Sequence, residues 1–228
     1  MAIVPRIVIY GASGMSAANA YNFAHGFSRP ICKVAAYIDD FRGGFGHHLD
    51  GIPIISFDEW KNNFRDLACY VAVTNPKSRR RLVEKILAGG GKFQRFYEPP
   101  EVAIPGVSID AGTSIFMPYS IYPPNTKIGC HVQVLPMCSI GHDVTIGDYV
   151  TICPSCTISG HVVIEEEVFV GAGATVVNGT QERPLVIGAG ARISAGAVVT
   201  KSIPAEASVA GNPARTLREL ARARKARE

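Results

Sequence analysis

The sequence predicts an α/β unit over residues 1–100, a parallel β-helix over residues 101–214, and a short basic helix or tail over residues 215–228. In the first hundred residues, apolar strand-like runs alternate with helical patterns, as in a parallel sheet covered by helices. From about residue 102 onward, an aliphatic residue recurs at every sixth position. With 228 residues, of which 47% are hydrophobic, the chain is long enough to bury a core in each part.

The first unit is expected to begin with an apolar strand over residues 6–10, a turn at Gly11–Gly14 and an Ala-rich helix over residues 15–27. The same pattern then repeats along the chain. It predicts strands at 34–38 and 68–73, a short edge segment at 51–55 and a helix at 76–88.

The six-residue period is typical of a β-helix in which three short edges close one coil of roughly 18 residues. It is unbroken over nine positions: Ile128, Val134, Ile140, Ile146, Ile152, Ile158, Ile164, Val170 and Val176. The same period holds upstream at Ile109, Ile115 and Ile121, with one extra residue before Ile128. It resumes downstream, after a loop at 178–185, at Ile187, Ile193 and Val199. Residues eighteen apart, such as Ile128 and Ile146, are therefore expected to stack in one apolar ladder.

Charge and hydropathy exclude several classes of protein. The formal charge is +4, and the last fifteen residues contain six basic and two acidic side chains, so the rest of the chain is neutral overall. Nucleic-acid binding needs basic residues spread over a folded face and is not expected. The sequence contains neither eighteen consecutive apolar residues nor a signal-peptide pattern, so a cytoplasmic protein without a membrane span is predicted.

The six cysteines are expected to be reduced. Cys153 and Cys156 form a C-x-x-C motif, but no second ligand pair stands near them in the sequence to complete a zinc site. Cys138 and Cys156 are eighteen residues apart and fall on one ladder of the β-helix. Packing is therefore favoured over metal binding.

Four segments, together with the hexads, resemble one family of proteins. They are Tyr10–Gly14, Ile38–Asp40, Ile140–Asp143 and Ala210–Arg215. The chain resembles the sugar O- and N-acetyltransferases among the left-handed β-helix (hexapeptide-repeat) acyltransferases, which include UDP-4-amino-sugar N-acetyltransferases and sialic acid O-acetyltransferases. The resemblance covers nearly the whole chain. It implies a left-handed coil, a homotrimer, acetyl-CoA as cosubstrate bound between neighbouring subunits, no metal, and a Rossmann-like first domain that binds the nucleotide.

His142 is the candidate general base. It lies two residues past Ile140, off the inward column, and Asp143 follows it directly. An imidazole with an ordinary pKa near ~6.5 accepts a proton at neutral pH, and an adjacent carboxylate orients it and stabilises the imidazolium. His131 and His161 have no carboxylate beside them in the sequence and are expected to be exposed corner residues.

The resemblance assigns further residues to the cosubstrate. The backbone N–H of Gly160 is the implied donor to the thioester oxygen. The small residues Gly171, Ala172 and Ala195 match positions that contact pantetheine, and Arg215 is a candidate for phosphate binding.

Substrate-binding residues are expected in the first unit. A turn between a strand and a helix directs backbone amides toward a phosphate, which favours Gly11, Ser13 and Gly14. The resemblance places Asp39, Asp40 and Asn75 at the nucleoside. The sequence departs from the family at Met15, where the family commonly has histidine. His47 and His48 are candidates to substitute for that histidine, but they lie in a glycine-rich segment over 43–51 for which a mobile loop is the favoured role.

The favoured function is N-acetylation of a nucleotide-linked amino sugar, with UDP and GDP both open. O-acetylation of sialic acid or of a polysaccharide sugar would use the same base and stays open. A non-catalytic trimer that binds nucleotide sugars is a further alternative. A zinc carbonic anhydrase is disfavoured, because it needs two histidines five residues apart, whereas His131, His142 and His161 are spaced by eleven and nineteen.

Overall fold

The computed structural model describes residues 4–12, 14, 17–18, 21, 32–43, 46–94, 96–97, 106–116, 119–121 and 124–225. The chain divides into two compact units, Met1–Phe96 and Tyr97–Glu228. Of the helix expected over 15–27, only residues 17, 18 and 21 are described, and all three are helical. Ser13 and Met15 lie outside the described residues.

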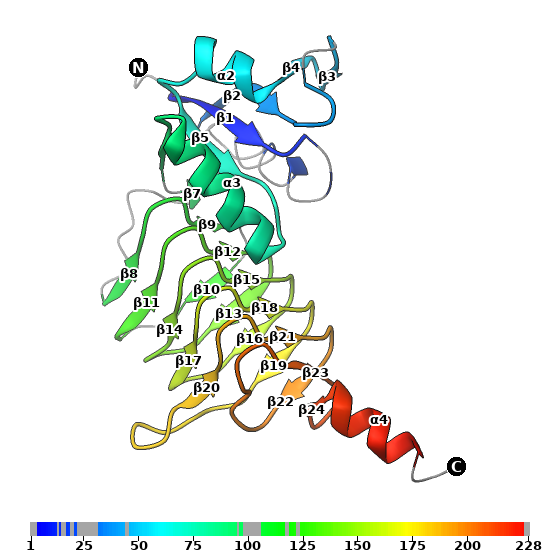
Figure 1. The fold of residues 1–228 in the computed structure, drawn as a ribbon. Coiled ribbons are helices and arrows are strands. Elements are labelled where there is room, and N and C mark those ends of the chain that lie inside the picture. Colours follow the sequence, from blue (N-terminus) through cyan, green and yellow to red (C-terminus); the bar gives the residue numbers. More distant parts are fainter. Residues whose placement is uncertain are drawn as a thin grey trace. The chain divides into compact units, whose positions relative to one another are not determined.

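The described part of the N-terminal unit contains a six-stranded sheet in the order β3-β4-β2-β1-β5-β6 (Figure 1). Its strands are β1 (Arg6–Tyr10), β2 (Lys33–Ile38), β3 (His48–Leu49), β4 (Ile52–Ile55), β5 (Ala68–Val71) and β6 (Lys92–Phe93). All neighbours pair in parallel except β3 and β4, which are antiparallel. The prediction that residues 51–55 form the edge of the sheet was wrong. The outermost strand on this side is β3, which lies in the segment predicted to be a loop and pairs with β4.

Two helices of this unit begin at side-chain caps. The helix α2 (Phe57–Asn63) was not predicted, although its capping box is a sequence signature: Ser56 Oγ accepts from the Glu59 N–H and Glu59 Oε2 accepts from the Ser56 N–H. The helix α3 (Pro76–Ala88) has the predicted bounds, and Asn75 caps it by accepting from the Ser78 N–H at 2.9 Å.

A polar network joins β1, the end of β2 and α3. The Tyr10 hydroxyl donates to Asp40 Oδ2 at 2.7 Å, and Lys85 Nζ lies 2.8 Å from Asp40 Oδ1 and 2.9 Å from the Tyr10 oxygen. Burial raises the pKa of the Asp40 carboxyl, but the hydrogen bonds from Lys85 and Tyr10 outweigh it, so this pKa lies below its ordinary value.

We expect Asp40→Asn to lower the free energy of unfolding of this unit by about 0.5–1 kcal/mol at neutral pH, since water screens a pair whose side chains are 38% and 40% exposed. A carboxyl whose pKa is lowered by folding stabilises the fold above its unfolded-state pKa of about 3.9, and this contribution is lost as the pH falls through the folded-state pKa. The difference between variant and wild type should therefore shrink in acid. Trp60, the one tryptophan of the sequence, is fully buried here, so its fluorescence follows unfolding of this unit. Equal stability at neutral pH would contradict the expectation.

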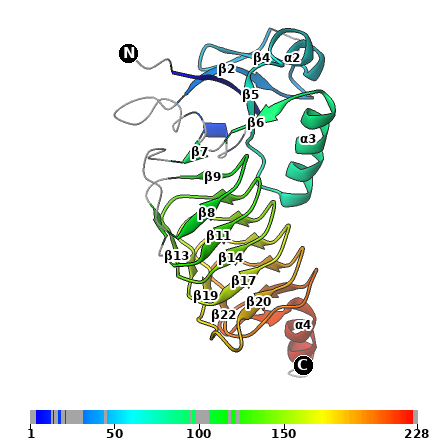
Figure 2. The same ribbon diagram turned by 90° about the vertical axis from the view of Figure 1, so that its left-hand side faces the viewer.

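The second unit is a parallel β-helix whose coils present three sheets (Figure 2). The first sheet contains β10 (Tyr119–Ile121), β13 (Cys138–Ile140), β16 (Thr157–Ile158), β19 (Thr175–Val176) and β22 (Val198–Val199). The second contains β8 (Val107–Ile109), β11 (Thr126–Ile128), β14 (Thr145–Ile146), β17 (Val162–Ile164) and β20 (Leu185–Ile187). The third contains β7 (Phe96–Tyr97), β9 (Ser114–Ile115), β12 (Gln133–Val134), β15 (Thr151–Ile152), β18 (Phe169–Val170), β21 (Arg192–Ile193), β23 (Ser208–Ala210) and β24 (Arg215–Thr216). The strands from β9 to β23 pair in parallel, and β24 pairs antiparallel with β23.

The strand registers confirm the predicted ladders. Ile128 pairs with Ile146, and Ile146 pairs with Ile164; the other two columns pair in the same way. Upstream, Ile109 pairs with Ile128 across the extra residue, and downstream Ile164 pairs with Ile187 across the loop, as the sequence predicts. These side chains form one buried apolar cluster. Cys138 and Cys156 belong to it, as predicted. The last described element is α4 (Leu217–Lys225), whose first turn is capped by Thr216 and Glu219.

The corners of the coils repeat as regularly as the core. A non-glycine residue with φ between +54° and +66° occurs at every sixth position: Asn125, His131, Met137, Asp143, Tyr149, Ser155, His161 and Glu167. Asparagine, aspartate and histidine tolerate this left-handed conformation better than most residues. Corner residues eighteen apart therefore stack just as the core residues do.

No helix in the described part of the chain is long and apolar enough to cross a membrane.

Candidate functional site

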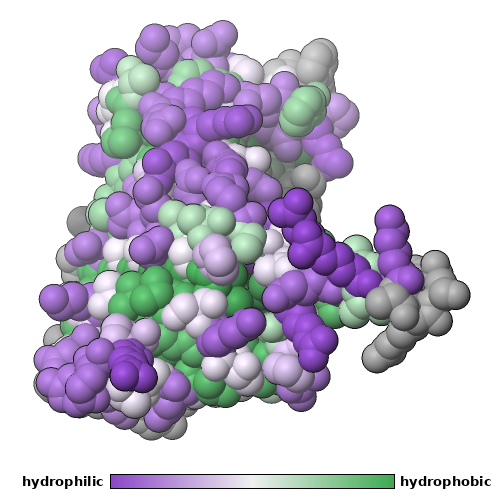
Figure 3. Space-filling view, turned by 60° about the horizontal axis from the view of Figure 1, so that its bottom comes forward, coloured by the Kyte–Doolittle hydropathy of each residue, from purple (hydrophilic) through white to green (hydrophobic). Residues whose placement is uncertain are grey.

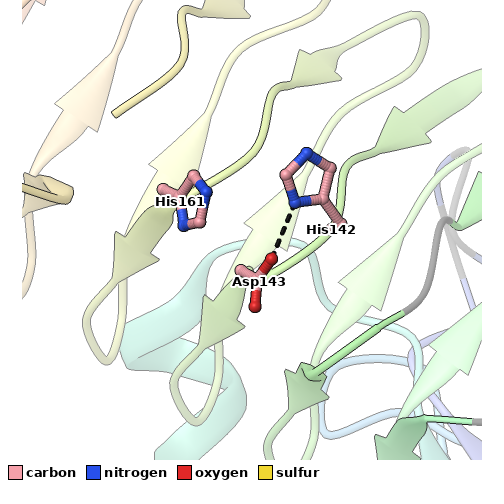
Figure 4. A group of neighbouring side chains, drawn as sticks. All are labelled: His142, Asp143 and His161. Carbon is pink, nitrogen blue, oxygen red and sulfur yellow. Dashed lines mark hydrogen bonds and ion pairs between the residues drawn. The ribbon is translucent and has the colours of Figure 1, made fainter. Parts of the chain in front are cut away.

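His142 and Asp143 form the turn that follows β13. His142 Nδ1 lies 2.7 Å from Asp143 Oδ2, and the two side chains are 46% and 29% exposed (Figure 4). Because an ionised carboxylate can only accept a hydrogen bond, this contact requires the proton to be on Nδ1. The Nε2 atom of His142 then keeps its lone pair and can accept a proton from a bound group.

Asp143 is held on its other side by Asn125. The Asn125 Nδ2 group donates to Asp143 Oδ1 at 2.9 Å from the corner eighteen residues earlier. This hydrogen bond, together with the one from His142 and the nearby charge of His161, holds the pKa of the Asp143 carboxyl below its ordinary value. Asp143 is therefore a carboxylate at neutral pH, as its orienting role requires. The sequence reasoning missed Asn125, although its eighteen-residue spacing from Asp143 signals it.

The structure corrects the expectation for His161, which has no carboxylate beside it in the sequence but lies close to one in space. Its ring is edge-on to that of His142, with centroids 5.1 Å apart and an interplanar angle of 89° (Figure 4). Ring nitrogens of both histidines and a carboxylate oxygen of Asp143 lie within 4.8 Å of one another. This trio is the one group of three such side chains close enough to hold a metal ion among the described residues.

The expectation for His131 was wrong. It is 8% exposed and stacks on Tyr149, with ring centroids 5.2 Å apart and an interplanar angle of 11°. The reason is the corner spacing: Tyr149 follows His131 by eighteen residues, so the next coil covers the imidazole.

Gly160 lies next to His142 because it occupies the equivalent position one coil later. A Cβ atom at Gly160 would stand 2.8 Å from His142 Nε2 and 2.9 Å from Cε1, so only glycine leaves room for the imidazole. The Gly160 N–H, implied as an oxyanion donor, donates to Asn178 Oδ1 at 3.2 Å. A thioester oxygen would therefore have to replace the Asn178 side chain at this donor.

Three of the residues implied for acetyl-CoA lie in one open cavity of about 390 Å³. Gly171, Ala172 and Ala195 line it, together with Cys153, Phe169, Arg192, Ile193, Ser194, Ser208 and Leu217. The Arg192 guanidinium covers the Phe169 ring at 4.8 Å. Arg215 is exposed on β24 and is not among the lining residues. Figure 3 shows hydrophobic patches on this end of the β-helix and hydrophilic side chains where α4 projects.

The structure separates the residues expected to bind substrate in the N-terminal unit. Gly14 lines a cavity of about 310 Å³ with Ala12, Ala17, Ala18, Tyr21, Tyr37, Arg42, Leu49 and Asp50. Gly11, Asp39, Asp40 and Asn75 are not among its lining residues. Asp39 accepts from the backbone N–H groups of Phe41 and Arg42, Asp40 is paired with Lys85, and Asn75 caps α3. These three side chains therefore have structural partners.

Comparisons with known proteins identify the family to which the chain belongs. The family model for bacterial transferase hexapeptide (six repeats) matches residues 125–160, which include His142 and Asp143. GDP-perosamine N-acetyltransferase of Escherichia coli O157:H7 is 42% identical over 183 residues, which are 80% of this chain and 81% of that protein. The chain belongs to the hexapeptide-repeat acyltransferase family.

Solved structures share the fold over nearly the whole chain. WeeI from Acinetobacter baumannii AYE is 31% identical with a TM-score of 0.75, and the match covers 94% of this chain and all of that one (100%). A mutant of perosamine N-acetyltransferase from Caulobacter crescentus, in complex with CoA and GDP-perosamine, has a TM-score of 0.80 at 24% identity and covers 94% of this chain and 97% of that one.

Proposed function

We propose that this chain transfers an acetyl group from acetyl-CoA to the amine of a GDP-linked amino sugar of the perosamine type. The observation that carries the proposal is the His142–Asp143 pair, which stands half exposed on a hexapeptide β-helix with one imidazole nitrogen available. The Escherichia coli relative, named GDP-perosamine N-acetyltransferase, supports the nucleotide, the amine and the acetyl group.

His142 Nε2 acts as the general base in this reaction. The amine nitrogen attacks the thioester carbon, and His142 takes a proton from that nitrogen as the C–N bond forms. Asp143 stabilises the resulting imidazolium. The C–S bond then breaks with its electron pair going to sulfur, and the His142 proton passes to the coenzyme A thiolate. The Gly160 N–H stabilises the developing oxyanion once the thioester oxygen has replaced Asn178.

The residues named above divide between the two ligands. In the proposal, Gly171, Ala172 and Ala195 contact pantetheine in the 390 Å³ cavity, and the exposed Arg215 contacts a phosphate of coenzyme A. The turn at Gly11, Ser13 and Gly14 binds the nucleotide phosphates. Asp39, Asp40 and Asn75 reach the nucleoside only if ligand binding frees them from their present partners.

The architecture in the proposal is that of the family. The N-terminal sheet is Rossmann-like, the coil is left-handed, and the active unit is a homotrimer. The trimer is supported by the exposure of the site: the cavity is open and His142 is exposed on the surface of one chain. A neighbouring subunit can therefore cover the open side of the cavity and of the His142 site.

The proposal is tested by following coenzyme A release with a thiol reagent when the purified full-length chain and acetyl-CoA meet one acceptor at a time. The acceptors are GDP-perosamine, a UDP-linked 4-amino sugar and free sialic acid. Turnover is expected with GDP-perosamine, and mass spectrometry should find one acetyl group on the product. Turnover with sialic acid alone would overturn the N-acetyl proposal, and turnover with the UDP sugar alone would overturn the choice of nucleotide.

A further inference from the structure

We infer that His161 is a second proton acceptor, which takes the first proton from the ammonium form of the substrate before His142 takes the second. The inference rests on the proposed function, because it concerns the amine that is acetylated. His161 is nineteen residues from His142, but it follows Asp143 by eighteen residues and so occupies the equivalent corner one coil later. The structure brings the two imidazoles to one site.

An amine acceptor must lose two protons in this reaction. A primary amine has an ordinary pKa of about 8–10 and is mainly ammonium at neutral pH, where its nitrogen has no lone pair for attack. The first proton must leave to give the nucleophile, and the second leaves as the C–N bond forms. One proton ends on the thiol of coenzyme A and the other goes to water. A hydroxyl acceptor loses only one proton, so a second base serves an amine and not a hydroxyl.

The geometry allows one nitrogen to reach two members of the trio. A ring nitrogen of His161 lies within 4.8 Å of a ring nitrogen of His142 and of a carboxylate oxygen of Asp143. Because these atoms are at most 4.8 Å apart, a donor nitrogen about 2.8 Å from each of two of them subtends an angle of at most about 118°, a range that includes the tetrahedral angle between two N–H bonds of an ammonium group. A substrate ammonium can therefore donate to His161 and to a second member of the trio at once.

The charges around His161 favour this role. His142 and Asp143 face it from the preceding coil, and the Asp143 carboxylate interacts with the charges of both histidines. In the loop that follows, the Leu185 N–H donates to the His161 carbonyl at 3.0 Å, and the charged residues Glu182 and Arg183 are exposed. The Asp143 carboxylate thus lies beside whichever imidazole holds a proton and attracts the incoming ammonium.

The test compares kcat/KM of the full-length wild type and His161→Asn for GDP-perosamine, from about pH 6 to about pH 9.5. Asparagine also tolerates the left-handed corner, where His161 has a φ of 54°, so the fold is retained. The matched control is His131→Asn, which makes the same exchange at a corner with a φ of 55° outside the site. Melting curves of both variants check their folding.

His161→Asn is expected to lower kcat/KM about tenfold near neutral pH, and the loss should disappear at high pH, where the substrate arrives as the free amine. Added imidazole should restore part of the activity of this variant at low pH. His131→Asn should give a pH profile parallel to that of the wild type. A loss that is equal at all pH values, or no loss at low pH, would overturn the inference. If the wild type acetylates no amino sugar at any pH, the proposed function has failed, and the inference fails with it.

Discussion

Replacing His142 with alanine is expected to lower kcat for acetyl transfer by about 10²–10⁴-fold, the usual contribution of a positioned general base. The change removes the one nitrogen that the hydrogen bond to Asp143 leaves free to accept the amine proton. KM for acetyl-CoA should change little, because His142 is not among the residues that line the 390 Å³ cavity. Steady-state kinetics in which acetyl-CoA is varied at a saturating concentration of the amino sugar measures both constants.

The fold should survive this substitution, since the His142 side chain is 46% exposed and lies outside the apolar column. A melting temperature close to that of the wild type is the control. If kcat of His142→Ala stays within about tenfold of the wild type, another group accepts the proton and the base assignment is wrong.

The second large effect is expected from Gly160→Ala, which displaces the base without removing it. The new Cβ would stand 2.8 Å from His142 Nε2 and 2.9 Å from Cε1, closer than real Cβ atoms approach such neighbours. The imidazole is the movable end of a side chain, so it should rotate away and leave the backbone in place. We expect kcat to fall by about 10²-fold, because misplacing a catalytic group by about 1 Å has an effect of this size.

A double variant separates this explanation from others. In the His142→Ala background, Gly160→Ala should cause almost no further loss, because the side chain that it displaces is already absent. The alanine keeps its backbone N–H, so an oxyanion contact there is preserved. A further large loss in the double variant would show that Gly160→Ala acts on something other than the imidazole.

The strand pairs of the β-helix can be predicted from the sequence because the six-residue period fixes which residues of neighbouring coils lie side by side. A column such as Ile128, Ile146 and Ile164 can be predicted residue by residue, and the strand pairs confirm it. The same spacing applies to polar corners, so Asn125 and His161 could have been assigned to the site of Asp143. They were missed because the period was applied only to apolar residues.

The N-terminal unit was harder to predict because its contacts follow no period. The pairing of Asp40 with Lys85 joins residues 45 positions apart, and no local pattern relates them. The two-residue strand β3 lies in a glycine-rich segment that predicts a loop. The capping box of α2, in contrast, is local and readable: Ser56 and Glu59 have the spacing that begins a helix.

The most direct test of the central claim is the position of the substrate amine in a crystal structure of the full-length protein with coenzyme A and GDP-perosamine. The account predicts that the amine nitrogen lies about 2.6–3.2 Å from His142 Nε2, or one water away, with the coenzyme A sulfur beside it. An amine bound on another face of the β-helix, beyond the reach of His142 even through a water molecule, would contradict it.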